Sequence, residues 1–437
     1  MGSIKPYKTT LSLMQSIQDR IMFPFSQATL SFNSVLSMVN EELIDNAVPG
    51  LREMHNEYFV YTKNVPLIPN VGIYPIPDRA QAMVLRDLNY VDVGGRFHEM
   101  ARTSPEDKAF FQGSSGNNES FSKFYVQGNN IILNPIVTTV TGSLNMSFFM
   151  RPNFLVRDDR ACIIQNFQKP ITVGTVSVGD ILNIVLASQT EAPLTVMLTA
   201  VSGTAALNQF TVGATPALTA ISLVSAITAL NIDNFIASST QSVVMVTYET
   251  ISTSITSLSS ALVVDNTYTY VIFDQLPSTY VDIDTNEMSP FYTINSKVDF
   301  LQTNPGHEMY AYDVKLKGIL SGNVGKFLTT DLMTYRTSSA GTTQKAFWPI
   351  LTGDYICLNN ECIIPQIPPE HHSMLAEMTA SRILSAIGDK DGYAISQARI
   401  GQMGKQSSAL VGNRIEGQTI KVFNSNSFLR SSGRRRF

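Results

Sequence analysis

The chain has 437 residues, a formal net charge of −4 and only 15% charged residues. This length suffices for two or three domains, and no window reaches the ~18 consecutive apolar residues of a membrane span. Three cysteines make no disulfide framework, and no apolar signal region follows Met1, which together predict folding in a reducing cytoplasm. Ordinary globular proteins carry roughly 25% charged residues, so we expect partner subunits to cover much of the surface. The alternative is a monomer with a Ser/Thr-rich exterior.

The first 60 residues predict an arm followed by helices. Residues 1–25 show no clear period and predict an extended or weakly helical arm. Asn33 or Ser34 then suits the N-cap of a helix, and Pro49 suits the first turn of a second helix. The apolar residues at helical spacing are Leu36, Val39, Leu43, Leu51, Met54, Tyr58 and Phe59. We therefore predict a helix pair joined at a proline.

Extended segments follow. Residues 65–77 contain several prolines, which predicts extended segments at the edge of a sheet. Three apolar runs at 124–126, 131–133 and 144–150 are separated by turn residues. This spacing predicts an antiparallel meander.

A cation-free island interrupts the chain. Between Ile171 and Ser296 there is no Lys, Arg or His, but there are nine carboxylates. The island therefore contributes −9 to the net −4, which leaves +5 for the flanks. Short β-branched runs predict strands at 181–187, 195–200, 243–248 and 268–273, and residues 219–230 predict one helix. We interpret the island as a small β domain that packs a single helix.

The C-terminal region predicts mixed structure and then two helices. A strand is expected around 310–316, and a hairpin at 353–364 with its turn at Asn359-Asn360. Helices are predicted from Glu370 to Ile387, with Gly388 as the C-terminal cap, and from Tyr393 to about Leu410. From Ser373 onward there are ten Lys or Arg and four Asp or Glu.

Catalytic signatures are missing, so we predict no enzyme and no cofactor. Cys357, Cys362, His371 and His372 could supply zinc ligands, but their spacing fits no standard closed site. The alternative is that the two cysteines face each other across the hairpin. Residues 282–287 begin like a calcium loop but lack its turn glycine and final glutamate. A solvated acidic loop is the alternative.

The basic C-terminus predicts a docking arm, because apolar anchors alternate with its arginines. A solvated tail is the alternative. The arm residues are Phe428, Leu429, Arg430, Arg434, Arg435, Arg436 and Phe437.

Short motifs in the flanks, in the same order, resemble the head-to-tail adaptor (connector, or neck) proteins of tailed bacteriophages. The motifs are Val39-Asn40-Glu41-Glu42-Leu43, Val48-Pro49, Asn56-Glu57-Tyr58-Phe59-Val60, Tyr74-x-Ile76-Pro77-x-Arg79-Ala80, Leu85-Arg86-Asp87-Leu88, Asn130-Ile131-Ile132-Leu133-x-Pro135, Arg151-Pro152-Asn153, Ile367-Pro368 and Asn413-Arg414-Ile415-Glu416-Gly417. They cover about half of the chain and are packing motifs.

The resemblance implies a structural virion protein that forms a dodecameric ring beneath the portal of the phage head. The ring would connect the portal to neck or tail proteins in the virion, after assembly in the host cytoplasm. Genomic DNA would pass through its channel without sequence-specific binding. The C-terminal arm would dock on the portal, and helices carrying the ring core would line the channel. The residues assigned to that core are Leu36, Val39, Leu43, Met54, Tyr58, Leu375, Met378 and Ile383.

Together these observations predict an α+β fold with a discontinuous helical-bundle core, a β-strand meander, an inserted mainly-β domain and an extended C-terminal arm. The predicted boundaries are 1–168 and 275–437 for the core and 169–274 for the insertion. An alternative function is a β-rich surface adhesin or carbohydrate-binding virion protein. The island contains no Trp, whereas carbohydrate sites usually expose aromatic platforms, which argues against that alternative.

Overall fold

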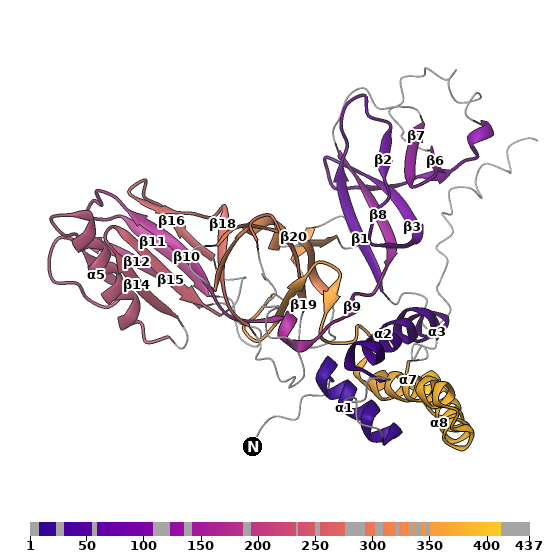
Figure 1. Cartoon of the computed structure of the whole chain (residues 1–437). Helices are drawn as coiled ribbons and strands as arrows, with labels where there is room; N and C mark the ends of the chain where they lie inside the picture. The colour runs from indigo at the N-terminus through magenta and orange to yellow at the C-terminus, as the bar shows by residue number, and fades with distance from the viewer. Residues whose placement is uncertain are drawn as a thin grey trace, which may run out of the picture.

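The computed structural model describes residues 8–22, 30–54, 59–107, 123–134, 142–186, 194–232, 235–249, 254–275, 293–301, 309–319, 323–332, 335–337, 343–345 and 350–411. Strands make up 43% of the structure and helices 30%. Four parts are visible in Figure 1: a helical unit, an N-terminal β unit, a central barrel and an outer β module. The predicted helical-bundle core is therefore wrong, since a closed six-stranded β-barrel occupies the centre.

The helical unit combines both ends of the described chain. Its first helix begins at the N-cap Thr9, whose side chain accepts from the Ser12 N–H, and buries Leu13 and Ile17. The N-terminal arm predicted over residues 1–25 is therefore wrong for this segment, because the apolar side chains recur on one helical face. The elements are α1 (Thr10–Ile21), α2 (Phe32–Glu42), the π-helix η1 (Leu43–Ala47), α3 (Val48–Met54), the 3-10 turn η4 (Pro369–His371), α7 (His372–Ile387) and α8 (Lys390–Val411).

Pro49 lies in the first turn of a second helix, α3, as predicted, and a π-helical segment joins α2 to it without a break. The N-cap of α2 is Ser31, not Asn33 or Ser34, and its hydroxyl accepts from the Ser34 N–H at 3.2 Å. The Val48 N–H donates to the Leu43 carbonyl, closing the wider π turn. Proline cannot donate the next helical hydrogen bond, and a π turn accommodates that irregularity without ending the helix.

Two four-stranded sheets form the N-terminal β unit. Their strand orders are β1-β8-β3-β4 and β2-β7-β6-β5. The predicted three-stranded meander is wrong, because β6 and β7 form a hairpin while β8 joins the other sheet, between β1 and β3. The strands are β1 (Val60–Pro66), β2 (Ile73–Pro75), β3 (Ala80–Asp92), β4 (Phe97–Glu99), β5 (Ala101–Arg102), β6 (Lys123–Gln127), β7 (Asn130–Asn134) and β8 (Gly142–Met150), with the 3-10 turn η2 (Pro105–Asp107).

The barrel is closed by pairing between segments nearly 200 residues apart in sequence. Its strand order is β10-β18-β21-β20-β19-β24, and β24 pairs back with β10 through Ile356↔Cys162. Phe300 and Phe327 meet edge to face inside it, with ring centroids 5.4 Å apart. The strands are β10 (Cys162–Val173), β18 (Tyr268–Gln275), β19 (Lys297–Leu301), β20 (Met309–Ile319), β21 (Val324–Leu328) and β24 (Tyr355–Leu358).

The outer β module extends from the barrel along β10. Residues 162–168 of this strand pair with β18 in the barrel, and residues 167–173 pair with β15 and β17 of the module. One sheet continues the barrel through β14, β15 and β17, and the second has the order β13-β12-β11-β16. The predicted strands and the single helix of the island are confirmed; α5 begins at Pro216, after the N-cap Thr215. The module elements are β11 (Ile181–Leu186), β12 (Leu194–Val201), β13 (Gln209–Thr211), α5 (Pro216–Ala229), β14 (Ile236–Thr240), β15 (Val243–Tyr248), β16 (Ser254–Ser257) and β17 (Leu262–Val264).

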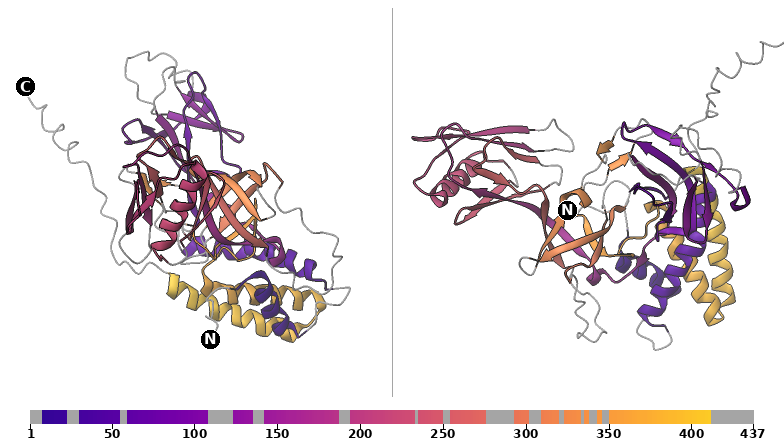
Figure 2. Two further views of the ribbon diagram at one scale, coloured as in Figure 1. Left: turned by 90° about the vertical axis from the view of Figure 1, so that its left-hand side faces the viewer. Right: turned by 90° about the horizontal axis from the view of Figure 1, so that it is seen from above.

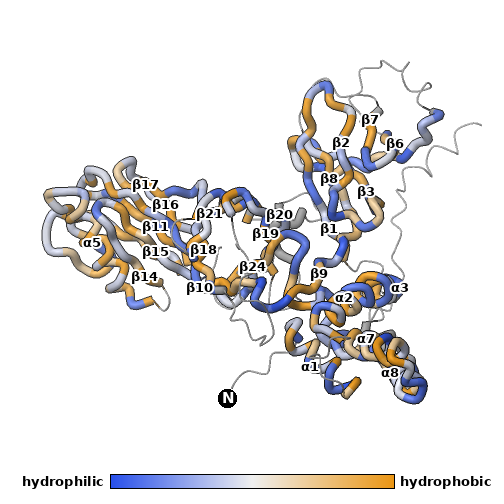
Figure 3. Tube along the Cα trace, viewed as in Figure 1, coloured by the Kyte–Doolittle hydropathy of each residue, from blue (hydrophilic) through white to orange (hydrophobic). Residues whose placement is uncertain are grey.

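Two hydrophobic cores divide the molecule. One joins the helical unit to the N-terminal β unit, and the other runs without interruption through the barrel and the outer module. Figure 2 shows the outer module and the helical unit on opposite sides of the barrel. Apolar (orange) and near-neutral (white) colours dominate α5, β11 and β15 in Figure 3.

The turn at Asn359-Asn360 is confirmed, and Asn360 takes a positive φ of 67°. The strand after it, however, pairs in parallel with β9 (Phe154–Leu155), so residues 353–364 do not form an isolated hairpin. The remaining elements are the 3-10 turn η3 (Asp158–Arg160), α6 (Thr329–Leu332), β22 (Tyr335–Thr337), β23 (Thr343–Lys345) and β25 (Glu361–Cys362).

Candidate functional site

An open groove of about 540 Å³ lies between the end of α2 and the helix pair α7–α8. Its lining residues are Glu42, Asn46, Met378, Ser381, Arg382, Ser385, Ala386, Tyr393, Gln397 and Ile400. The only oppositely charged groups in this lining, Arg382 and Glu42, already form an ion pair at 3.3 Å. The groove therefore offers a mixed polar and apolar contact surface, in which the two charged side chains are already paired with each other.

Glu377 joins the two chain ends that build the groove. Its carboxylate accepts from Arg20 Nε on α1 at 2.7 Å and from the Ser396 hydroxyl on α8 at 2.8 Å. The Glu377 side chain is 5% exposed. A buried carboxylate is stable only when such donors compensate for its lost hydration. The carboxylate therefore fixes α8 against α7 and α1 at this point.

Helix α8 buries few of its side chains. Among its residues 390–406, for which side-chain burial is described, Ser396 alone is buried. Tyr393 and Ile395 are 40% and 57% exposed, and Ile387 at the end of α7 is 49% exposed. A helix of 22 residues normally gains its stability from a buried apolar face. The single chain leaves much of that face in solvent.

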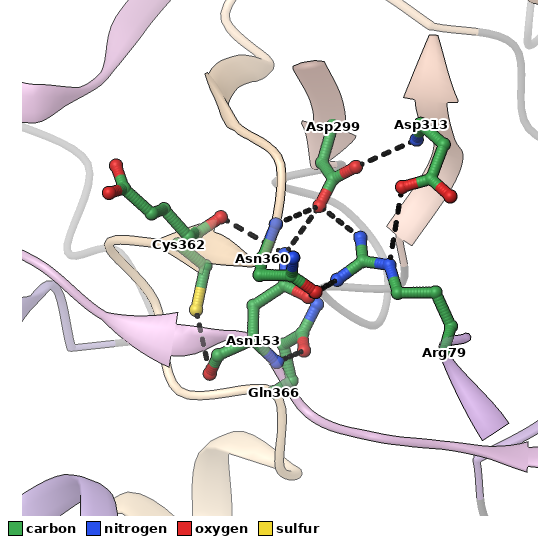
Figure 4. A network of polar contacts seen from close by, with 8 residues as sticks. Arg79, Asn153, Asp299, Asp313, Asn360, Cys362 and Gln366 are labelled. Carbon is green, nitrogen blue, oxygen red and sulfur yellow. Dashed lines mark hydrogen bonds and ion pairs between the residues drawn. The ribbon is translucent and has the colours of Figure 1, made fainter. Parts of the chain in front are cut away.

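A buried polar junction connects the barrel to the N-terminal β unit (Figure 4). Asp299 on β19 forms an ion pair with Arg79, which lies just before β3, and accepts from Asn153 Nδ2 at 2.9 Å. It also accepts from the backbone N–H groups of Asn360 and Asp313 at 3.1 and 2.9 Å. The Asp299 and Arg79 side chains are 0% and 5% exposed. Residues far apart in sequence thus meet around one carboxylate.

Burial shifts the pKa of several ionisable groups in and near this junction. Burial raises the pKa of Asp299, although the Arg79 charge opposes this shift. Burial also raises the pKa of the Cys357 and Cys362 thiols. Because the thiolate is the reactive form of cysteine, both side chains stay protonated at neutral pH and are poor nucleophiles. The three cysteines of the chain are all buried thiols, and no disulfide joins them.

The structure brings together most of the residues assigned to the ring core. Val39, Leu43, Leu375 and Ile383 are buried in the core of the helical unit, and Leu36 packs against it. Met378 instead lines the groove. The side chain of Met54, all of Tyr58 and the entire docking arm from Phe428 to Phe437 lie outside the described residues.

Of the four possible zinc ligands, His372 makes hydrogen bonds to the backbone through both ring nitrogens. His372 Nδ1 accepts from the Lys8 backbone N–H at 3.0 Å, and its Nε2 bonds the Ile367 carbonyl at 3.1 Å. Within the described ranges, no group of three or more His, Cys, Asp and Glu side chains could hold a metal ion. The acidic loop at 282–287 lies outside those ranges.

Sequence reasoning did not single out Asp299, Glu377 or the exposed face of α8. Arg79 and Asn153 appeared only as parts of packing motifs. A lone acidic residue within an apolar strand, as in Val298-Asp299-Phe300, was the available signal for the junction, because buried carboxylates need partners.

No protein-family model matches the chain, and no curated protein matches its sequence. None of the helices within the described segments is both long and apolar enough to cross a membrane.

Proposed function

We propose that this protein is a structural adaptor whose copies assemble head to tail into a ring. The observation that carries the proposal is the exposed face of α8 and the α7 terminus, with Ile387, Tyr393 and Ile395 beside an open groove. A second copy that seats against this face would supply the apolar cover that the single chain lacks. Because the contact would join two different surfaces, repetition of it generates a closed ring or a filament.

The charge composition supports the same proposal. Charged residues are 15% of the chain, and protein interfaces are depleted in charged residues at their centres. The groove fits this description, because its Arg382–Glu42 pair is the only pairing of opposite charges in the lining. An apolar face of this kind on a purely monomeric protein would favour aggregation.

Within this proposal the ring connects the portal of a tailed-phage head to neck or tail proteins, and DNA passes through its centre. This part follows from the order of the packing motifs in the flanks. The outer β module then projects from the ring or contacts a neighbouring neck protein. The basic residues 427–437 dock on the portal.

Negative-stain electron microscopy of the purified full-length chain tests the ring. We expect annular particles with a central opening. Single particles the size of one 48.1 kDa chain at micromolar concentration would contradict the proposal. The docking arm is tested separately by deletion of residues 427–437, which should leave the ring intact but prevent its co-sedimentation with portal particles.

A further inference from the structure

Four lysines form a transverse row on the barrel, which we call the lysine belt: Lys297, Lys315, Lys317 and Lys326. Lys297 on β19 and Lys315 on β20 are direct partners in the antiparallel ladder. Lys326 on β21 is opposite Gly318, the residue that follows Lys317. The belt therefore crosses three adjacent strands, which spans about 10 Å at the usual strand spacing.

The belt lies on the outer wall of the barrel. Val298, Val314, Leu316 and Phe327 alternate with the lysines along the strands and are buried, so their side chains fill the interior. Lys297, Lys315 and Lys317 are exposed, and Lys326 is half-buried. Side chains of successive strand residues point to opposite faces. A β-bulge between Leu316 and Gly318 interrupts this alternation, so Lys317 and Gly318 both lie on the outer side, where Gly318 faces the Lys326 side chain. The four lysine side chains therefore project from the same outer face.

Two tyrosines of β18 flank the belt. Lys326 Nζ lies 3.8 Å from the ring centroid of Tyr268 and 5.7 Å from that of Tyr270. Such cation–π contacts hold an ammonium group without neutralising its charge. The aromatic pair thus orients Lys326 at one end of the belt.

The charges of the belt lack compensation within the described part of the chain. None of its ion pairs involves a belt lysine. Like charges directly opposite each other in a sheet destabilise it, and Lys297 and Lys315 are such a pair. A surface with this cost and no ion-pair partner among the described residues is suited to an external anion.

We propose that the lysine belt binds the phosphate backbone of duplex DNA without reading its sequence. Duplex DNA carries one negative charge per about 1.7 Å of its axis, so a 10 Å contact presents several phosphates to the belt. Lysine ammonium groups act as flexible point charges, which suits backbone contacts and not base recognition. An acidic protein surface would need several carboxylates at matching positions, whereas DNA supplies closely spaced anions along its whole length.

This contact surface is independent of the proposed ring. A chain that does not form rings could still bind DNA through the belt, and a ring could form without DNA binding. The two proposals are tested by different measurements.

The test compares two full-length triple variants with the same change in charge. The belt variant is Lys297→Gln/Lys315→Gln/Lys317→Gln, and the control is Lys63→Gln/Arg96→Gln/Arg102→Gln, at exposed cations of the N-terminal β unit. Fluorescence anisotropy with a labelled duplex of about 30 base pairs, between roughly 50 and 300 mM NaCl, gives affinity and salt dependence. Thermal unfolding verifies that both variants are folded.

We expect the belt variant to lose about tenfold or more in affinity at the lowest salt, with a log–log salt slope shallower by up to about 2.7. The control should stay within about twofold of the wild type. Equal affinities and slopes for the two variants would overturn the proposal. Absence of DNA binding by the wild type, with self-association at low salt that the belt variant loses, would overturn it in favour of an acidic protein partner.

Discussion

Replacement of Asp299 by alanine should destabilise the protein more than any surface charge change. The side chain is fully buried and accepts hydrogen bonds from Arg79, Asn153 and two backbone N–H groups. Its loss removes the nearer carboxylate of the buried Arg79 guanidinium and leaves Asp313, at 3.4 Å. Breaking one side of a buried ion pair costs about 3–5 kcal/mol. We therefore expect Asp299→Ala to lower the free energy of unfolding by that amount.

Urea denaturation at fixed protein concentration measures this effect, because oligomerisation makes apparent stability concentration-dependent. Asp87→Ala is the matched control, since Asp87 pairs with Arg86 at the surface and is 53% exposed; its loss should cost less than about 1 kcal/mol. The double variant Arg79→Leu/Asp299→Leu should lose less free energy of unfolding than Arg79→Leu and Asp299→Leu lose in sum. We expect the difference to be about 0.5–3 kcal/mol. If Asp299→Ala lowers the free energy of unfolding no more than Asp87→Ala does, the buried junction does not stabilise the fold as we argue.

Three further predictions concern the helical unit. Glu377→Ala should lower the free energy of unfolding by roughly 3 kcal/mol, because Arg20 loses its buried partner; wild-type stability in urea would contradict the bridging role. Gly388→Ala should lower the free energy of unfolding by about 1 kcal/mol, because Gly388 caps α7 at a φ of 83°. Gly401→Ala is the control: a Cβ at this position in α8 meets open space, so the substitution should stabilise the helix by a few tenths of a kcal/mol or more. Burial lowers the pKa of His371 in the folded chain. Below the ordinary histidine pKa of about 6.5, the unfolded chain therefore binds more protons at this residue than the folded chain does. The free energy of unfolding should fall as the pH decreases through that value. His371→Phe should reduce the fall in Tm between pH 7.5 and pH 5.5, and an unchanged fall would exclude His371 as its source.

The sequence predicted those helices and strands whose start, end or type depends on neighbouring residues, such as helix caps and β-branched runs. The Ala-rich island helix has an N-cap threonine followed by Pro216, and α7 ends at Gly388, so both carry their own start or stop signals. The β-branched runs of the island likewise appear as strands β11, β12, β15 and β18. Each of these features depends on residues within a few positions of one another.

The barrel depends on contacts that a single sequence does not display. Its closure pairs Cys162 with Ile356, and no periodicity relates segments that far apart. The same limit explains β8, which has the alternation of a meander strand but pairs with β1 and β3. The C-terminal region, where we expected mixed structure, supplies four of the six barrel strands: β19, β20, β21 and β24. The barrel, and not a helical bundle, therefore occupies the centre of the fold.

The candidate site was predicted only in part, for a related reason. Helical spacing identified the apolar residues that are buried, such as Val39 and Leu375, because burial follows periodicity. The groove and the exposed face of α8 result from how α2, α7 and α8 pack together. The partners of Asp299 lie up to 220 residues from it in the sequence, so their convergence needed the structure.

The central claim is that copies of this chain join through the face formed by α7 and α8. Native mass spectrometry of the wild type and of Ile395→Lys, at equal concentration, tests it most directly. A desolvated charge in an apolar contact is strongly unfavourable, so we predict one discrete closed oligomer for the wild type and predominantly monomer for the variant. A monomeric wild type, or an oligomer that Ile395→Lys leaves unchanged, would contradict the account.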